Sequence, residues 1–170
     1  IVALPEASGG WREIELSQPR AWAEHPDAFS SRVAFAAAHV VADPRGENVP
    51  GAPAAIDWET TLAFRQHLFR YGLGVAEAMD TAQRNMGLDW PATQELITRS
   101  SALAQEHGAR IASGAGTDQL LAPAGSLQEV TRAYLEQVEF VETAGSQVIM
   151  MASRHLAALA RSAEDYLQVY

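Results

Sequence analysis

The fold of this chain is indicated first by six consecutive apolar residues, VAFAAA at positions 33–38, which lie between Arg32 and His39. Three further short apolar runs follow at a nearly constant spacing and begin at positions 73, 110 and 147. Short and nearly continuous apolar runs are typical of parallel β-strands that are buried on both faces. We therefore predict four parallel strands, one in each run.

Amphipathic patterns between these runs predict helices with recognisable ends. Each helix is preceded by a side chain that can cap its N-terminus, and the first three are followed by a glycine that suits the left-handed residue after a helix. The capping residues are Asp57, Asp89, Ser126 (with Glu129 in an S-x-x-E capping box) and, for a fourth helix, Ser162, and the glycines are Gly72, Gly108 and Gly145. The inner faces are expected to carry Leu62, Leu68 and Phe69, then Leu96, Ile97, Leu103 and Ala104, then Leu127, Val130, Tyr134, Val138 and Val141.

Alternating strands and helices imply a parallel sheet with right-handed crossovers. A doubly wound sheet usually carries a G-x-G-x-x-G turn after its first strand, whereas here the first run continues into HVVAD at 39–43. Four units make half of an eight-unit barrel. We therefore predict an α/β fold in which residues 32–170 form the first four βα units of a (β/α) barrel of the TIM type.

Residues 1–31 are predicted to form an N-terminal hairpin and linker outside this barrel. Two short strand-like segments, at 1–4 and 12–16, flank Ser8-Gly9-Gly10, a turn sequence that tolerates positive φ.

Half a barrel would leave two unpaired strand edges and one uncovered apolar face. We therefore expect that the chain is not a free-standing monomer. Either a longer gene product supplies the remaining barrel half or a second copy completes the sheet, and a homo-oligomer is the expected state.

The composition narrows the classes of function. The net charge is -9, all twelve basic residues are arginine, and these arginines are scattered along the chain. Such a chain is not expected to bind nucleic acid or an anionic membrane surface, so a small-molecule substrate is the expected partner. No cysteine is present, which excludes disulfides and thiolate metal sites and fits a cytoplasmic protein.

The candidate catalytic residues follow the first two predicted strands, because active sites of such barrels lie at the C-terminal ends of the strands. His39 follows the first strand, and Glu77 and Asp80 follow the second. An imidazole or a carboxylate at this place can act as a general base or a metal ligand. Alternatively, His39 is a hydrogen-bonded structural histidine, and one of the acids caps the short segment that follows.

The candidate substrate-binding residues follow the third and fourth strands. Gly114 and Gly116 would let a substrate approach the backbone, and Thr117 and Asp118 offer a donor and an acceptor. Arg154 could bind a carboxylate or phosphate through two hydrogen bonds. The alternatives are a tight turn with Asp118 as a local cap and a surface arginine.

A divalent metal is the cofactor that these residues would suit, and no nucleotide cofactor is expected. His39, Glu77 and Asp118 together offer an imidazole and two carboxylates, a set that binds hard or borderline divalent ions. Their spacing forms no local metal motif, so this hypothesis depends on the predicted fold.

Several stretches of the chain resemble a poorly characterised bacterial family that is grouped with the dihydrodipicolinate synthase and N-acetylneuraminate lyase barrels. These stretches are SRVAFAAAHVVAD (31–43), GAPAAIDWETTLAFRQHL (51–68), YGLGVAEAMDTAQRNMGLDW (71–90), ARIASGAGTDQL (109–120) and SQVIMMASRHLA (146–157). The resemblance implies that this chain is the N-terminal half of a protein about twice as long. It also implies aldol-type cleavage or condensation of oxo acids through a lysine Schiff base.

The chain departs from the pattern of this group in two places. The lysine of the group lies on a later strand, and this chain contains no lysine. The Gly-Thr-Thr-Gly-Glu motif, which grips the substrate carboxylate, is replaced by GVAEA at 74–78, where only Glu77 is retained. The Gly-x-Gly of the third strand is kept as Gly114 and Gly116.

Three hypotheses for the function follow. The first hypothesis is that the chain is part of a lyase that acts on a small oxo-acid or sugar-derived substrate, with the Schiff-base lysine outside this chain. The second is a metal-dependent isomerase or aldolase that uses His39 and the carboxylates. The third is a barrel fragment without catalytic activity.

Overall fold

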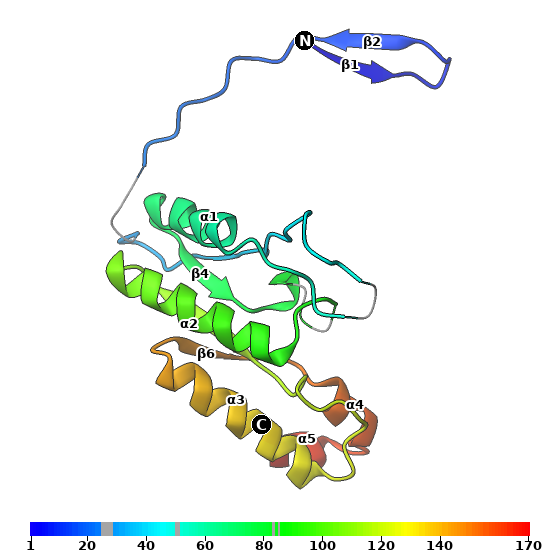
Figure 1. Cartoon of the computed structure of the whole chain (residues 1–170), viewed down its shortest axis with the longest axis vertical. Coiled ribbons are helices and arrows are strands. Elements are labelled where there is room, and N and C mark those ends of the chain that lie inside the picture. Colours follow the sequence, from blue (N-terminus) through cyan, green and yellow to red (C-terminus); the bar gives the residue numbers. More distant parts are fainter. Residues whose placement is uncertain (25–28, 50–51, 83, 85) are drawn as a thin grey trace.

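The structure is a computed structural model, and it describes residues 1–24, 29–49, 52–82, 84 and 86–170 (Figure 1). Strands and helices alternate after an N-terminal pair of strands. The elements in chain order are β1 (Val2–Pro5), β2 (Trp11–Ile14), β3 (Phe35–Ala37), α1 (Trp58–Arg70), β4 (Gly74–Glu77), the 3-10 helix η1 (Asp80–Ala82), α2 (Trp90–Glu106), β5 (Ile111–Ala115), α3 (Leu127–Thr143), β6 (Gln147–Met150), α4 (Arg154–Leu159) and α5 (Ala163–Val169).

Strands β3, β4, β5 and β6 form one parallel sheet, and their order in the sheet is their order in the chain. The register pairs Val75 with Ile111 and Ala112 with Gln147. Each predicted apolar run contains one of these strands, so the prediction of four parallel strands is confirmed. The protein is therefore a mixed α/β protein with a four-stranded parallel sheet flanked by helices.

One hydrophobic cluster lies between the sheet and the helices α1 and α2. Val75 and Ile111, which are opposite each other in the register, pack with Phe69 of α1 and Ala104 of α2. Because successive side chains of a strand point to opposite faces, these contacts identify the face of the sheet that the two helices cover.

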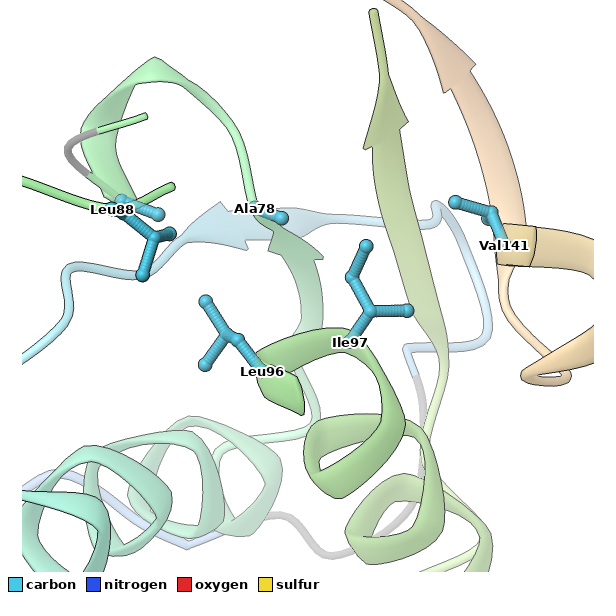
Figure 2. Packing of buried hydrophobic residues seen from close by; sticks show 6 residues of the cluster. Ala78, Leu88, Leu96, Ile97 and Val141 are labelled. Atoms are coloured by element: carbon cyan, nitrogen blue, oxygen red, sulfur yellow. The ribbon is translucent and has the colours of Figure 1, made fainter. Parts of the chain in front are cut away.

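A second cluster joins α2 and α3 to the carboxyl end of β4. Figure 2 shows Leu96 and Ile97 of α2 projecting toward the strands, with Ala78 at the end of β4 and Val141 on α3 nearby. Leu88, which precedes α2, belongs to the same cluster. Burial of these side chains removes them almost completely from water and fixes α2 against the sheet.

On β4 and β5 the residues that point away from the first cluster are glycine or alanine, whereas the edge strand β3 carries Phe35 on that face. Phe35 is 37% exposed, and it pairs with Gly74 in the register. A Cβ atom at Gly74 would lie 2.7 Å from two ring carbons of Phe35. Glycine is therefore required at this position, because the phenyl ring of the edge strand lies across it.

The predicted helix ends are confirmed by the cap geometry. Asp57, Asp89, Ser126 and Ser162 each accept a backbone hydrogen bond at the N-terminus of a helix, and Gly72, Gly108 and Gly145 adopt positive φ after α1, α2 and α3. The predicted capping box of α3 differs in one detail. The Glu129 carboxylate accepts from the backbone of Gly125 (2.8 Å) instead of the backbone of Ser126.

The N-terminal hairpin is also confirmed. β1 and β2 pair antiparallel, and Gly9 adopts a φ of 85° in the turn. Figure 1 shows this hairpin at the end of an extended segment, apart from the α/β body. Its side chains are exposed, apart from the half-buried Ile14.

The inner face of α1 differs from the prediction. The most deeply buried side chains are Thr61, Arg65 and Phe69, whereas Leu62 and Leu68 are only partly buried. The difference arises because Arg65 has a buried ionic partner, which hydrophobic periodicity alone does not reveal. The short helix α4 after β6 was not predicted either.

Within the part of the chain that the structure describes, every helix is too short or too polar to cross a membrane.

We predict that Leu96→Ala lowers the free energy of unfolding by about 2–5 kcal/mol, because it opens a cavity in the second cluster. Leu135→Ala on α3 is the matched control, since Leu135 is 52% exposed and its loss should cost at most about 0.5 kcal/mol. Urea denaturation followed by circular dichroism measures both changes. Equal losses for the two variants would contradict the assignment of this core.

Candidate functional site

A pocket of about 300 Å³ lies at the carboxyl ends of β4, β5 and β6. The strands are parallel, so the segments that follow them meet at one edge of the sheet. The residues that line the pocket are Asp80, Arg84, Met86, Gly116, Thr117, Asp118, Met151, Ala152, Ser153, Arg154 and His155. Five of the predicted site residues therefore share one pocket, namely Asp80, Gly116, Thr117, Asp118 and Arg154.

Arg84 forms a fixed wall of this pocket. Its Nη1 donates to the carbonyls of Ala78 (3.1 Å) and Gly114 (2.8 Å) at the ends of β4 and β5. Its Nε donates to Asp118 Oδ2 (3.1 Å), and its Nη2 donates to Asp118 Oδ1 and to Gln137 Oε1 (2.7 Å). A guanidinium has five N–H donors, and all of them are used here, so Arg84 has none left for a ligand.

Gln137 connects this wall to α3. Its Oε1 also accepts from the backbone N–H of Gly116 (2.7 Å), and its Nε2 donates to Asp118 Oδ1 (3.0 Å) and to Gln119 Oε1 (2.6 Å). The side chain is fully buried. The sequence contained a signal for this residue, because Gln137 is a polar residue three positions after Tyr134 on the predicted apolar face of the helix.

The predicted acceptor Asp118 is therefore a structural carboxylate. Its two oxygens are occupied by Arg84 and Gln137, and its side chain is 8% exposed. Thr117 retains a pocket-lining hydroxyl, but that hydroxyl is also bonded within the protein.

Thr117 belongs to a buried chain of hydroxyl and imidazole groups. Its Oγ1 lies 2.6 Å from Ser153 Oγ and 2.9 Å from His155 Nδ1. Ser153 Oγ also accepts from the backbone N–H of Leu156 (3.1 Å) and thereby caps α4. Sequence reasoning missed the role of His155, because it depends on the unpredicted helix that turns this side chain back toward β5.

The hydroxyl of Tyr134 supports the loop behind this chain. It donates to the Met151 carbonyl (2.6 Å) and lies 3.1 Å from the Tyr170 hydroxyl. Burial raises the pKa of Tyr134 above its usual range, and the hydrogen bond with Tyr170 raises it further. Tyr134 therefore remains protonated and keeps donating to the segment that follows β6.

Glu77 lies outside the pocket and is buried against α1. Arg65 Nε donates to its Oε2 (2.8 Å) and Arg65 Nη2 donates to its Oε1 (2.8 Å), and neither side chain is exposed. Glu77 was predicted as a catalytic or metal-binding group at the strand mouth. Because side chains alternate along the strand, Glu77 points instead to the face of the sheet that the helices cover, as does its register partner Ser113.

His39 also lies outside the lining of the pocket. Its side chain is exposed, and its backbone carbonyl accepts from Arg65 Nη1. The proposed metal ligands His39, Glu77 and Asp118 are therefore not brought together. Among the described residues, no three side chains of the metal-binding types form a cluster that could hold an ion.

Gly114 has a packing role in this structure and does not line the pocket. A Cβ atom there would lie 2.8 Å from both the Ala78 carbonyl oxygen and Met151 Sδ. Gly116 does line the pocket, and a Cβ atom there would meet its nearest neighbours, Asp118 Oδ1 and Met151 Cε, at 3.3 Å.

Ala78 lies between the hydrogen bonds of Arg65 with Glu77 and those of Arg84, and its backbone conformation is strained. Ala78 has a φ of 51° and is the single non-glycine residue of the described ranges with positive φ. Its N–H donates to Glu77 Oε1 (2.9 Å), and its carbonyl accepts from Arg84. A left-handed alanine costs about 1–2 kcal/mol, and these hydrogen bonds hold it in place.

A second, larger cavity of about 900 Å³ adjoins the pocket and shares Met86 and Asp118 with it. The loop that follows β3 contributes residues 48–49 and 52–54 to its lining. Within the proline- and glycine-rich loop from Pro44 to Pro53, residues 48–49 and 52–53 therefore border this cavity. Positions 50 and 51 lie outside the described residues.

We predict that Glu77→Ala lowers the free energy of unfolding by about 3–5 kcal/mol, because it leaves Arg65 buried without its carboxylate partner. Glu95→Ala is the matched control, since it removes an exposed ion pair with Arg99 and should cost at most about 0.5 kcal/mol. Urea denaturation measures both. If the two variants were equally stable, the buried pair would not be a constraint on the fold.

We also predict that Gly114→Ala destabilises the protein by about 1–3 kcal/mol, because the added methyl group collides with a backbone carbonyl. Gly116→Ala should cost less, because its nearest neighbours are more distant side-chain atoms. Thermal unfolding of the two variants provides the comparison, and a larger loss for Gly116→Ala would reverse the assigned roles.

The comparison with known proteins gives a family without an assigned activity. The sequence matches the model of a family described as a protein of unknown function, DUF993, over residues 2–170. A search of curated proteins finds no match. Since the family match spans nearly the entire chain, the chain belongs to the DUF993 family.

Proposed function

We propose that this chain is part of a carbon–carbon lyase that acts on a small oxo acid, with its substrate in the pocket at the ends of β4, β5 and β6. The observation that carries this proposal is the set of groups that share the pocket. Asp80, from the segment after β4, and Arg154 and His155, from the helix after β6, line about 300 Å³ of space. Pockets of this volume suit small ligands.

Arg154 is the proposed anchor for the substrate carboxylate. It is exposed, it lines the pocket, and it has no ion-pair partner among the described residues. The other arginine of the lining, Arg84, has all its donors occupied. A guanidinium binds a carboxylate through two parallel hydrogen bonds, so Arg154 can fix both the position and the orientation of the acid.

The topology of the sheet supports the further proposal that it is half of a (β/α)8 barrel. Sequential strand order with crossovers of one hand places all the connecting helices on the same side of the sheet, whereas a doubly wound sheet needs a reversal of order. The outer strands also carry exposed apolar side chains, Phe35 on β3 and Met150 on β6. These features suit a sheet that continues into further strands, either of a longer chain or of a second copy.

The proposed reaction requires an electron sink, which a Schiff-base lysine would supply. This chain contains no lysine, so that residue would have to come from outside it. The residues of this chain would then bind and orient the substrate, through Arg154, and exchange protons with it, through His155 and Asp80.

The arrangement gives less support to a metal-dependent isomerase or aldolase. Arg65 and Arg84 already neutralise the carboxylates of Glu77 and Asp118. Asp80 and His155 remain in the pocket as possible ligands, and further ligands would have to come from outside the described residues.

We predict that borohydride reduction of the full-length protein with pyruvate gives a lysine adduct, and that Arg154→Leu lowers its yield at low pyruvate about 10-fold or more. A charged hydrogen-bonded pair is worth about 1.5–3 kcal/mol, which gives this factor. Intact-mass and peptide mass spectrometry measure the adduct. Arg132→Leu, which removes an exposed arginine of α3, is the control and should leave the yield unchanged.

Two outcomes of this experiment would count against the proposal. The absence of any lysine adduct with pyruvate or other 2-oxo acids would contradict the Schiff-base chemistry. An adduct whose yield does not depend on Arg154 would contradict the location of the substrate.

A further inference from the structure

We infer that His155 presents an Nε2–H donor to the pocket in its neutral form, that Thr117 and Ser153 fix this tautomer, and that His155 and Arg154 together recognise a 2-oxo acid. The substrate class in this inference rests on the function proposed above, whereas the tautomer does not. His155 is one of the buried polar residues, and it takes no part in the hydrogen bonds described for Arg84 and Asp118.

The first step is the geometry of the three side chains. Thr117 Oγ1 lies between Ser153 Oγ at 2.6 Å and His155 Nδ1 at 2.9 Å, and all three residues are at least nine-tenths buried. Ser153 Oγ accepts one further hydrogen bond, from the Leu156 N–H. These contacts form a linear chain from a backbone donor to an imidazole nitrogen.

The second step is a count of the protons in this chain. If Ser153 donates to Thr117 and Thr117 donates to Nδ1, each hydroxyl donates one bond and accepts one, and Nδ1 is an acceptor. In the reverse direction Nδ1–H donates to Thr117 and Thr117 donates to Ser153. The Ser153 proton then has the neighbouring Tyr134 hydroxyl near it, but no hydrogen bond of normal distance and angle joins the two groups, which makes this arrangement less favourable in a buried site.

The third step concerns the other nitrogen of the ring. A neutral imidazole that accepts at Nδ1 carries its proton on Nε2. Across the described residues, the buried side-chain atoms left without a partner are the hydroxyls of Ser100 and Ser101. Nε2 of His155 forms no hydrogen bond with any of the described residues, and it is not one of these two buried atoms. His155 lines the pocket, and we place this N–H there.

The fourth step is the match to a ligand. Arg154 and His155 are consecutive residues at the start of α4, and both line the same pocket. Arg154 offers paired donors for a carboxylate, and His155 offers a single donor to the same pocket. In a 2-oxo acid the carboxylate and the keto oxygen lie on neighbouring carbons, so this ligand presents two acceptors that correspond to the two donors. A simple carboxylic acid would leave the His155 donor unused.

The tautomer is tested by ¹⁵N NMR of the full-length protein labelled at histidine, with His155 assigned from the His155→Phe variant. The expected result is a neutral ring with its proton on Nε2. Thr117→Val removes the donor to Nδ1 and should shift the ring toward a mixture of the two tautomers. Ser101→Ala, which removes a buried hydroxyl without a partner, is the control and should leave the His155 signals unchanged. A proton on Nδ1 in the unmodified protein would overturn the inference.

The substrate class is tested by the binding of two probes, pyruvate and propanoate, measured by calorimetry. Propanoate has the same charge and chain length but lacks the keto oxygen. We expect pyruvate to bind at least about 3-fold more tightly, and we expect His155→Phe to reduce this preference about 3- to 10-fold, the contribution of one neutral hydrogen bond, beyond any preference that a Schiff base supplies. The binding of propanoate should be unaffected by that substitution.

The outcomes separate the inference from the proposed function. If both probes bind equally, or if the size of the preference is unchanged in His155→Phe, the role of His155 is overturned while a carboxylate site at Arg154 stands. If neither probe binds, the substrate class fails together with the proposed function, and the NMR result still decides the tautomer.

Discussion

The guanidinium of Arg84 is the constraint on which the candidate site depends. It contacts backbone carbonyls at the ends of two neighbouring strands, the carboxylate of the loop after β5 and the amide of a side chain on α3. Because a guanidinium is planar and its donors have fixed directions, these partners are held in one relative arrangement. The pocket has a defined shape because its wall is this saturated network.

The absence of lysine is consistent with this mode of stabilisation. The buried cations, Arg65 and Arg84, each bind several acceptors at once, and a lysine ammonium has neither the reach nor the planar geometry to replace them. The carboxylates that these arginines bind are therefore shielded from solvent and are not available to bind or react with a ligand. Among the described residues, Arg154 is the pocket-lining arginine without an ion-pair partner.

The sequence predicted the backbone of this protein much better than its side-chain chemistry. Apolar runs and caps located all four parallel strands and the long helices, because those signals are local. Glu77 illustrates what such local signals do not predict, namely the partner of a buried side chain. Alternation along the strand puts it on the same face as Val75, but only the packing of α1 supplies the buried Arg65 that binds it there. His155 was missed for a related reason, because its environment is formed by residues 38 positions apart in the sequence.

The left-handed Ala78 has a consequence for cooperativity. Its amide N–H is held by the carboxylate that Arg65 binds, and its carbonyl is held by Arg84. One peptide segment therefore joins the network of α1 with that of β5 and α3. The two halves of the sheet are expected to open together in hydrogen exchange, as one cooperative unit, because neither network can separate without releasing the strained residue that both of them hold.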